Sequence, residues 1–278
     1  DGSCTDQILR SGIKEIFISA ADPDVRTNYK SIKKLKKNNV IVNVGLEKNR
    51  TYNLNKFFFK SVLKKKPFTK VKIATSTDEK IAWHDYKSKW ISNKSSREYA
   101  HKLRSMSQAI LTTSKTVLKD DPRLTIRLKK TLEQHIPIII IDNNLKIPMK
   151  SKILKDISKK RIIIFTSKKN KKSENLIKLG CEIIFCKLNK NKKLNLKNIF
   201  SKIYSLKISD LLVEAGGIFF TELLNKNLVD EIHLFKSKII IGKHGKPAIV
   251  GKKLSQLNLS LNERKKFKDD IYTNYQVN

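Results

Sequence analysis

The chain has 278 residues, enough for about two domains of ordinary size and for a sizeable core. Hydrophobic residues make up 39% and charged residues 31%, too apolar for a disordered chain, and the longest apolar runs fall far short of the ~18 residues of a membrane-spanning helix. The 60 basic and 25 acidic residues give a net charge of +35, but only nine basic residues are Arg and the Lys residues are spread along the whole chain. This pattern favours a compositional bias over a dedicated nucleic-acid surface, although a positive field still attracts phosphorylated small molecules.

We expect no targeting signal at the start of this chain. It opens on Asp1, without an initiator Met or the basic and apolar segments that direct export. Three cysteines at unrelated spacings do not form a disulfide framework and indicate a reducing compartment. We therefore expect a cytoplasmic protein with no membrane partner, and we expect position 1 to be a cut in a longer sequence.

The first 66 residues have the pattern of half an α/β domain. We expect a helix capped by Thr5, a strand at 15–20, a Lys-rich helix around 32–35 and a strand at 40–45. A segment rich in Phe and Lys follows and ends at Pro67, where we place the domain junction. The predicted domains are therefore 1–66 and 67–278.

The second domain alternates strand and helix patterns, which predicts an α/β fold. Its continuous β-branched runs suit a sheet that is covered on both faces, parallel in its middle and antiparallel at the C-terminal edge. The predicted strands are 69–75, 108–113, 137–142, 161–166, 182–186, 210–214 and 231–236, with a final pair near 257–261 and 271–275. The predicted helices are 95–105, 172–179, 197–205 and 217–225.

One local pattern in this domain has the features of an anion site. The buried strand that ends at Glu214 leads through Gly216 and Gly217 into an amphipathic helix. Free backbone N–H groups and the helix dipole at such a turn can bind a phosphate. A glycine pair is equally an ordinary solution to a tight strand-to-helix turn, and both interpretations stay open.

A second pattern follows the paired carboxylates of Asp120 and Asp121. Alternation after Pro122 places Arg123, Thr125 and Arg127 on one side of a short extended segment, where they could clamp a phosphate. The alternative is an Asp-Pro turn followed by a solvated edge strand.

The second pattern carries a family resemblance. Residues 109–113 and 116–127 resemble the signature of the reductase domain of the bifunctional riboflavin-biosynthesis deaminase/reductase family. Further segments match in the family's order, over about residues 67 to 237: Lys72-Ile73-Ala74, Ser88-Lys89-Trp90-Ile91, His101-Lys102-Leu103-Arg104, Val213-Glu214-Ala215-Gly216-Gly217 and Leu228-Val229-Asp230-Glu231. The resemblance implies a dihydrofolate-reductase-like mixed sheet flanked by helices.

The resemblance also implies an activity, a cofactor and a quaternary structure. The family's reductase uses NADPH, in preference to NADH, to reduce 5-amino-6-(5-phosphoribosylamino)uracil at ribosyl C1′ and gives 5-amino-6-(5-phosphoribitylamino)uracil. The expected partners are a phosphorylated small-molecule substrate and a second copy of the chain, as a homodimer formed through the reductase domain. No nucleic-acid partner is expected.

Site residues follow from the matching positions. Those implied for the cofactor are Ala74, Trp90, Thr116, Asp120, Gly216 and Gly217; those implied for the substrate are Ser88, Arg104, Leu124, Arg127 and Glu214. We interpret Lys72 and Glu214 as the catalytic pair, with the Lys72 ammonium assisting ring opening to the imine that accepts hydride. Lys72 could instead serve only as an ion-pair partner of Glu214 or Asp120. Thr166-Ser167-Lys168-Lys169 could receive the 2′-phosphate of NADPH, or could be another solvated turn.

The first 66 residues resemble the end of the family's zinc-dependent deaminase domain. Cys4 corresponds to its last zinc ligand, but the chain has no His-x-Glu and no Pro-Cys upstream of it. Because zinc needs three protein ligands, we expect this chain to hold no zinc and to lack deaminase activity. Zinc is expected only in a full-length protein that contains the missing half.

Two departures from the family concern the reductase loop between Asp78 and Ser88. The family has Gly where this chain has Glu79, and again near Tyr86, so the loop is expected to follow a different path. Two other functions remain as alternatives: a dihydrofolate-reductase-like reductase of another pteridine or pyrimidine, and a basic polyanion-binding protein.

Overall fold

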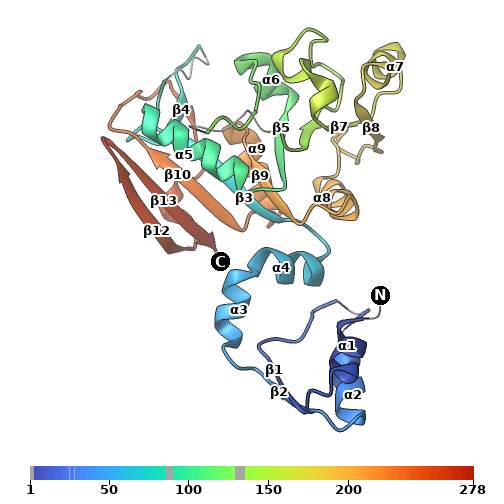
Figure 1. Cartoon of the computed structure of the whole chain (residues 1–278). Coiled ribbons are helices and arrows are strands. Elements are labelled where there is room, and N and C mark those ends of the chain that lie inside the picture. Colours follow the sequence, from blue (N-terminus) through green and yellow to red (C-terminus); the bar gives the residue numbers. More distant parts are fainter. Residues whose placement is uncertain (1–2, 25, 28, 86–89, 129–134) are drawn as a thin grey trace. The chain divides into compact units, whose positions relative to one another are not determined.

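The computed structural model describes residues 3–24, 26–27, 29–85, 90–128 and 135–278. The chain divides into two compact units, Asp1–Phe68 and Thr69–Asn278, which are described separately below (Figure 1). Within the described residues no helix has both the length and the apolar character that crossing a membrane requires.

The first unit is a small α/β layer. Helices α1 (Cys4–Arg10) and α2 (Lys30–Lys37) cover one face of the parallel pair β1 (Glu15–Ile18) and β2 (Ile41–Val44), and two short helices follow, α3 (Lys48–Leu54) and α4 (Lys56–Lys64). Ile32 and Leu35 of α2 are buried against the strands, as their spacing predicts. The expected cap at Thr5 is wrong, because the Ser3 hydroxyl accepts from the Asp6 N–H and forms a capping box with it.

The second unit is built on a nine-stranded sheet with the order β12-β13-β10-β3-β9-β5-β6-β7-β8. Its strands are β3 (Phe68–Thr75), β5 (Ala109–Thr113), β6 (Ile138–Ile141), β7 (Ile162–Thr166), β8 (Glu182–Phe185), β9 (Asp210–Val213), β10 (Glu231–Lys236), β12 (Leu259–Phe267) and β13 (Asp270–Val277). Pairing is parallel from β9 through β5, β6 and β7 to β8, and between β3 and β10. It is antiparallel from β10 through β13 to β12, so the expected mixed sheet with an antiparallel edge is confirmed.

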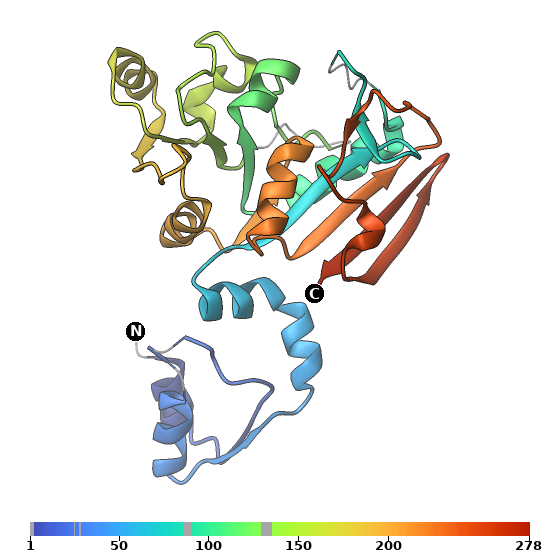
Figure 2. The same ribbon diagram turned by 180° about the vertical axis from the view of Figure 1, so that it is seen from behind.

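Helices cover both faces of this sheet. One face carries α5 (Lys94–Ser105), α6 (Ser114–Asp120) and α7 (Lys171–Lys178); the other carries α8 (Leu196–Ser205) and α9 (Gly217–Asn225). Figure 1 shows α5 crossing in front of the strands, and Figure 2 shows α9 on the opposite face. The isoleucines of β6 and β7 are buried on both faces, which explains their continuous apolar runs.

Smaller elements complete the unit. Strand β4 (Lys80–Ala82) pairs antiparallel with β11 (Lys246–Pro247), and three short 3₁₀ turns occur at Lys152–Leu154, Ile157–Lys159 and Leu254–Gln256. Helix α6 was not predicted from the sequence. Its cap is Thr113, whose hydroxyl accepts from the Thr116 N–H, and the strand pattern of 109–113 hides that cap.

Candidate active site

Three charged side chains meet on the α5 face of the sheet, beside the end of β9. Lys72 comes from the middle of β3, Glu214 follows β9 directly, and β3 and β9 are neighbours in the sheet. Arg104 reaches them from the last turn of α5, donating from Nε to Glu214 Oε1 at 2.5 Å and from Nη2 to Oε2 at 3.0 Å. The Lys72 ammonium lies 3.9 Å from Glu214 Oε2.

The backbone of Glu214 is held as firmly as its side chain. Its N–H donates to Leu111 O at 2.9 Å, and its carbonyl accepts from the Thr112 hydroxyl at 2.8 Å. Both partners lie in β5, the other neighbour of β9. β5 therefore holds the backbone of Glu214, and the Arg104 guanidinium holds its carboxylate.

Burial and charge set the protonation states of this group. Burial raises the pKa of Glu214, but Arg104 and Lys72 outweigh it and lower that pKa to about 2. Burial lowers the pKa of Lys72, Arg104 adds to the effect, and Glu214 and Asp120 oppose it. At neutral pH Glu214 is a permanent anion, whereas Lys72 releases its proton more readily than an ordinary lysine.

Helix α5 also binds the segment that follows α6. Arg104 donates from Nη1 to the Thr125 carbonyl at 2.9 Å, and His101, one turn earlier, accepts at Nδ1 from the Arg127 N–H at 3.1 Å. Arg127 turns its own guanidinium back, donating from Nη1 to the Thr125 hydroxyl at 2.7 Å. Sequence analysis assigned no role to His101, although its spacing of three residues from Arg104 places both on one helix face.

The segment itself does not follow the predicted alternation. Leu124 has a φ of 52°, and Leu124, Thr125 and Ile126 are buried in succession. A regular extended strand cannot place Arg123, Thr125 and Arg127 on one side across such a left-handed residue, so that expectation is wrong. The Leu124 side chain packs in the core with Val117 and Ile110, which leaves its backbone as the part that a substrate could contact.

The two glycines after β9 have different surroundings. A Cβ on Gly217 would lie 2.3 Å from Pro247 O and 2.7 Å from Ala248 O, so close packing requires this glycine. No described atom lies within 4 Å of the position that a Cβ would take on Gly216, which caps α9. Packing thus accounts for Gly217, and open space lies beside Gly216.

The other residues expected at the cofactor lie on several elements. Thr116 and Asp120 are on α6, with Asp120 close enough to Lys72 to influence its pKa, and Ala74 is on β3. Trp90 is 63% exposed, with the Arg97 guanidinium 4.1 Å from its ring centre. Ser88, expected at the substrate, lies outside the described residues.

The segment 166–169 lies at the carboxyl end of β7, beside β6. The Thr166 hydroxyl accepts from the Lys168 N–H, and the Ser167 hydroxyl donates to Asn143 O. Lys168 and Lys169 are exposed directly before α7, which Asn170 caps. This edge of a parallel sheet is where ligands bind in open α/β folds.

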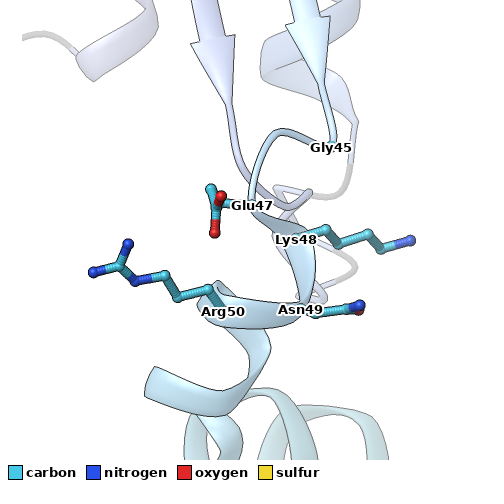
Figure 3. A pocket seen from close by; sticks show the side chains of 5 residues that line it. All are labelled: Gly45, Glu47, Lys48, Asn49 and Arg50. Atoms are coloured by element: carbon cyan, nitrogen blue, oxygen red, sulfur yellow. The ribbon is translucent and has the colours of Figure 1, made fainter.

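In the described part of the first unit, no comparable convergence of side chains occurs. A shallow hollow at the start of α3 is lined by Gly45, Glu47, Lys48, Asn49 and Arg50. Figure 3 shows Glu47 and Arg50 pointing to one side and Lys48 and Asn49 to the other, so they do not converge on a ligand. Cys4 is exposed on α1, and among the described residues no three His, Cys, Asp or Glu side chains are grouped as metal ligands.

The chain itself, compared with known proteins, matches one family. The family model described as the RibD C-terminal domain matches residues 67–273. The chain belongs to the RibD C-terminal domain family. It is 36% identical over 240 residues to the riboflavin biosynthesis protein RibD of Aquifex aeolicus, covering 86% of this chain and 65% of that protein. It is 30% identical over 281 residues to RibD of Actinobacillus pleuropneumoniae, covering 99% of this chain and 74% of that protein.

Solved structures agree with the sequence match. A Thermotoga maritima protein described as a diaminohydroxyphosphoribosylaminopyrimidine deaminase/5-amino-6-(5-phosphoribosylamino)uracil reductase is similar with a TM-score of 0.80 at 27% identity, over 99% of this chain and 74% of that one. Acinetobacter baumannii RibD has the same fold, with a TM-score of 0.85 at 21% identity, over 99% of this chain and 76% of that one. The chain thus spans 65% of the Aquifex RibD and 74–76% of these other relatives.

The unusual residue at position 79 has a structural explanation within this family fold. Glu79 has a φ of 58° in the turn between β3 and β4, a conformation that glycine adopts most readily. Its carbonyl accepts from the Ala248 N–H at 2.9 Å and its Oε2 accepts from the Leu254 N–H at 3.2 Å. These bonds help to hold a non-glycine residue in this conformation. Tyr86, the other departure, lies outside the described residues.

Proposed function

We propose that the unit Thr69–Asn278 is an NADPH-dependent 5-amino-6-(5-phosphoribosylamino)uracil reductase. The observation that carries the proposal is the half-buried Lys72–Glu214–Arg104 group beside the end of β9 in a RibD C-terminal domain. In such a group Lys72 can supply a proton while the Glu214 carboxylate holds a negative charge close by. Reduction at a ribosyl C1′ needs both.

In this proposal Lys72 moves the proton. The ribosylamine ring opens when the ring oxygen gains a proton, which leaves a protonated imine at C1′ that can accept hydride. A lysine whose pKa is lowered by burial transfers its proton more readily than an exposed one. The Lys72 ammonium is thus suited to act as the general acid at the ring oxygen.

Glu214 has a different role, because its pKa of about 2 keeps it ionised at any working pH. An anion that is already oriented stabilises the positive charge of the protonated imine without reorganising during the reaction. We assign Arg104 to the substrate site because it holds Glu214. Its two parallel bonds orient the Glu214 carboxylate, and the carboxylate in turn balances the Arg104 charge.

Arg127 is the cation that we assign to the substrate 5′-phosphate. Its side chain lies at the surface of the segment after α6, and a guanidinium can bind phosphate oxygens through two parallel N–H bonds. Leu124, through its backbone, and Ser88 complete the proposed substrate site.

NADPH would supply the hydride. The open space beside Gly216 and the first-turn amides of α9 fit a pyrophosphate, and Thr116, Asp120, Ala74 and Trp90 are the further residues we assign to the cofactor. We assign the 2′-phosphate to Lys168 and Lys169. Changing both to Glu should abolish the preference for NADPH over NADH, measured as the ratio of kcat/KM values; an unchanged ratio would exclude this location.

The activity is tested directly by following NADPH oxidation at 340 nm with the phosphoribosylamino substrate. We expect turnover that saturates in both NADPH and substrate, and none with a dihydropteridine or with the dephosphorylated nucleoside. Turnover that is equal with and without the 5′-phosphate would instead favour a reductase of another pyrimidine.

Two further proposals rest on the family resemblance alone. The unit Asp1–Phe68 would be the end of a deaminase domain, with Cys4 as a zinc ligand only in a protein that also contains the other ligands. The reductase unit would form a homodimer, which light scattering of purified protein would detect as twice the chain mass.

A further inference from the structure

His101 is a half-buried residue that contacts the proposed substrate segment, and the proposed reaction does not use it. It lies one turn before Arg104 on α5, and the two side chains bind peptide groups two residues apart: the Arg127 N–H and the Thr125 carbonyl. Residues 122–128 contain only a single bridge residue, Ile126, and no strand ladder. Side chains of α5 therefore supply hydrogen-bond partners for the Thr125 and Arg127 peptide groups of this segment.

The orientation of Arg127 depends on this backbone. Its guanidinium is bound to the Thr125 hydroxyl, so both ends of the short span 125–127 are tied together before the side chain reaches any ligand. Thr125 is itself 3% exposed and cannot move without disturbing the core. A shift of the Arg127 peptide group would move the guanidinium by a similar amount.

We propose that His101 is a positioning residue: by accepting the Arg127 N–H at Nδ1, it fixes the guanidinium for the substrate phosphate. This inference rests on the proposed function, because it assumes that Arg127 binds the substrate. The bond requires an unprotonated Nδ1, with the ring proton on Nε2. Arg104 and Arg127 disfavour protonation of His101, whereas Glu214 and a hydrogen bond with the Thr125 backbone favour it.

The surroundings keep the ring in the required state. Burial, followed by the two arginines, lowers the pKa of His101 to about 4, so it is neutral at physiological pH. Protonation would place a hydrogen on Nδ1, remove the acceptor from the Arg127 N–H and add a third positive charge beside two guanidinium groups. Acidification through about pH 4 is thus expected to release the segment.

Two variants separate the acceptor from the volume of the ring. His101→Asn keeps an oxygen acceptor near the Nδ1 position and has a helix propensity close to that of His; His101→Leu keeps bulk but has no acceptor. We expect His101→Leu to raise the substrate KM about tenfold, with kcat and the NADPH KM changed less than about twofold. His101→Asn should stay within about threefold of the unchanged enzyme in all three constants.

A measurement without turnover tests the same bond. In ¹⁵N–¹H spectra, the Arg127 amide should lose its protection from exchange in His101→Leu and keep it in His101→Asn, while the Glu214 amide, bonded to Leu111 O, serves as the unaffected control. In the unchanged protein the Arg127 amide signal should shift as the pH falls through about 4. This pH titration uses only the unchanged protein and so does not depend on whether His101→Leu folds.

The outcomes distinguish this inference from the proposed function. Absence of NADPH-dependent turnover in the unchanged protein would overturn the function, and with it the role assigned to Arg127. If turnover is present, equal Arg127 protection in both variants, or a fall in kcat at constant KM in His101→Leu, would overturn the positioning role. Equal loss in the Asn and Leu variants would also overturn it, because the acceptor would then not be what matters.

Discussion

Arg104 donates to both oxygens of Glu214 and to the Thr125 carbonyl, so much of its hydrogen-bonding capacity is used before any ligand arrives. Arg127 donates from Nη1 to the Thr125 hydroxyl of its own segment and lies at the surface. The Glu214 carboxylate matches the charge of Arg104 through two parallel N–H bonds. Arg104 therefore orients Glu214, and Arg127, which we assign to the substrate phosphate, is the residue from which we expect a direct effect on substrate affinity.

Kinetics of Arg127→Ala and Lys72→Ala test this division of roles. Losing a charge-assisted contact to phosphate costs about 1.5 to 3 kcal/mol, so Arg127→Ala should raise the substrate KM by about ten- to a hundredfold with little change in kcat. Lys72→Ala should lower kcat, because proton transfer is felt at the transition state. Arg127→Lys, which keeps the charge but not the paired N–H groups, should fall between. A large kcat loss in Arg127→Ala at constant KM, or intact turnover in Lys72→Ala, would contradict this assignment.

The pH dependence of kcat tests the proton donor. Burial lowers the folded-state pKa of Lys72 below 10.5, so the acid form is lost, and kcat should fall, at a pH below that value. Glu214 holds this pKa up, and Glu214→Gln should therefore move the alkaline limb to lower pH. Lys72→Arg serves as the control, since guanidinium does not titrate in this range. An alkaline limb that stays in place in Glu214→Gln would show that another group titrates.

Among the elements, β3 carries two lysines with different roles: Lys72 in the proposed active site and Lys70 in a buried ion pair. Near its start, Lys70 donates to Asp210 Oδ2 at 2.8 Å and to Met106 O at 3.2 Å, and the Asp210 side chain is only 5% exposed. This pair lies on the same sheet face as Lys72, but we expect it to contribute to stability and not to catalysis. Breaking one partner of a buried pair leaves an unmatched charge, which is more costly than removing both.

Lys70→Met should lower the free energy of unfolding by about 3 to 5 kcal/mol at neutral pH, measured by urea denaturation. Burial already raises the pKa of Asp210, opposed by Lys70, so losing Lys70 raises it further and the deficit should shrink as acid protonates the carboxyl. The double variant Lys70→Met with Asp210→Asn should recover most of the loss. A double variant as unstable as the single one would show that packing of the Lys70 stem, and not charge, is responsible.

The sequence predicted most elements of the sheet but not how the site is held. Continuous Ile and Val runs identify buried strands such as β6 and β7, because burial on both faces leaves little choice of residue. Helix α6 was missed since its cap, Thr113, also ends a strand. The left-handed Leu124 has no sequence signal, and without it neither the broken alternation nor the bonds from His101 could be foreseen. Lys72, Arg104 and Glu214 were named by family resemblance; their mutual contacts required the fold.

At the scale of the whole molecule, the first unit contains one residue, Cys4, of a type that binds zinc. Catalytic zinc needs three protein ligands, and the described residues contain no such group. The purified chain should hold less than about 0.1 zinc per molecule by plasma mass spectrometry after dialysis. Cys4→Ser should not change that value. One tightly held zinc per chain that disappears in Cys4→Ser would contradict the prediction.

The position of β3 inside the sheet has a consequence for how the molecule is made. Its neighbours β9 and β10 come from the far end of the chain, with Lys70 opposite Glu231 in the register, and the Arg104–Glu214 bond joins residues 110 positions apart. Strand β3 therefore leaves the ribosome long before β9 or β10 has been synthesised. Until then its edges cannot form their sheet hydrogen bonds and its apolar residues cannot be fully buried. Contacts of such long range slow folding, because the closure of a long loop precedes any gain from it. A chain synthesised only up to β8 would contain Lys72 and Arg104 but not Glu214, so the Lys72–Glu214–Arg104 group can assemble only after β9 has entered between β3 and β5.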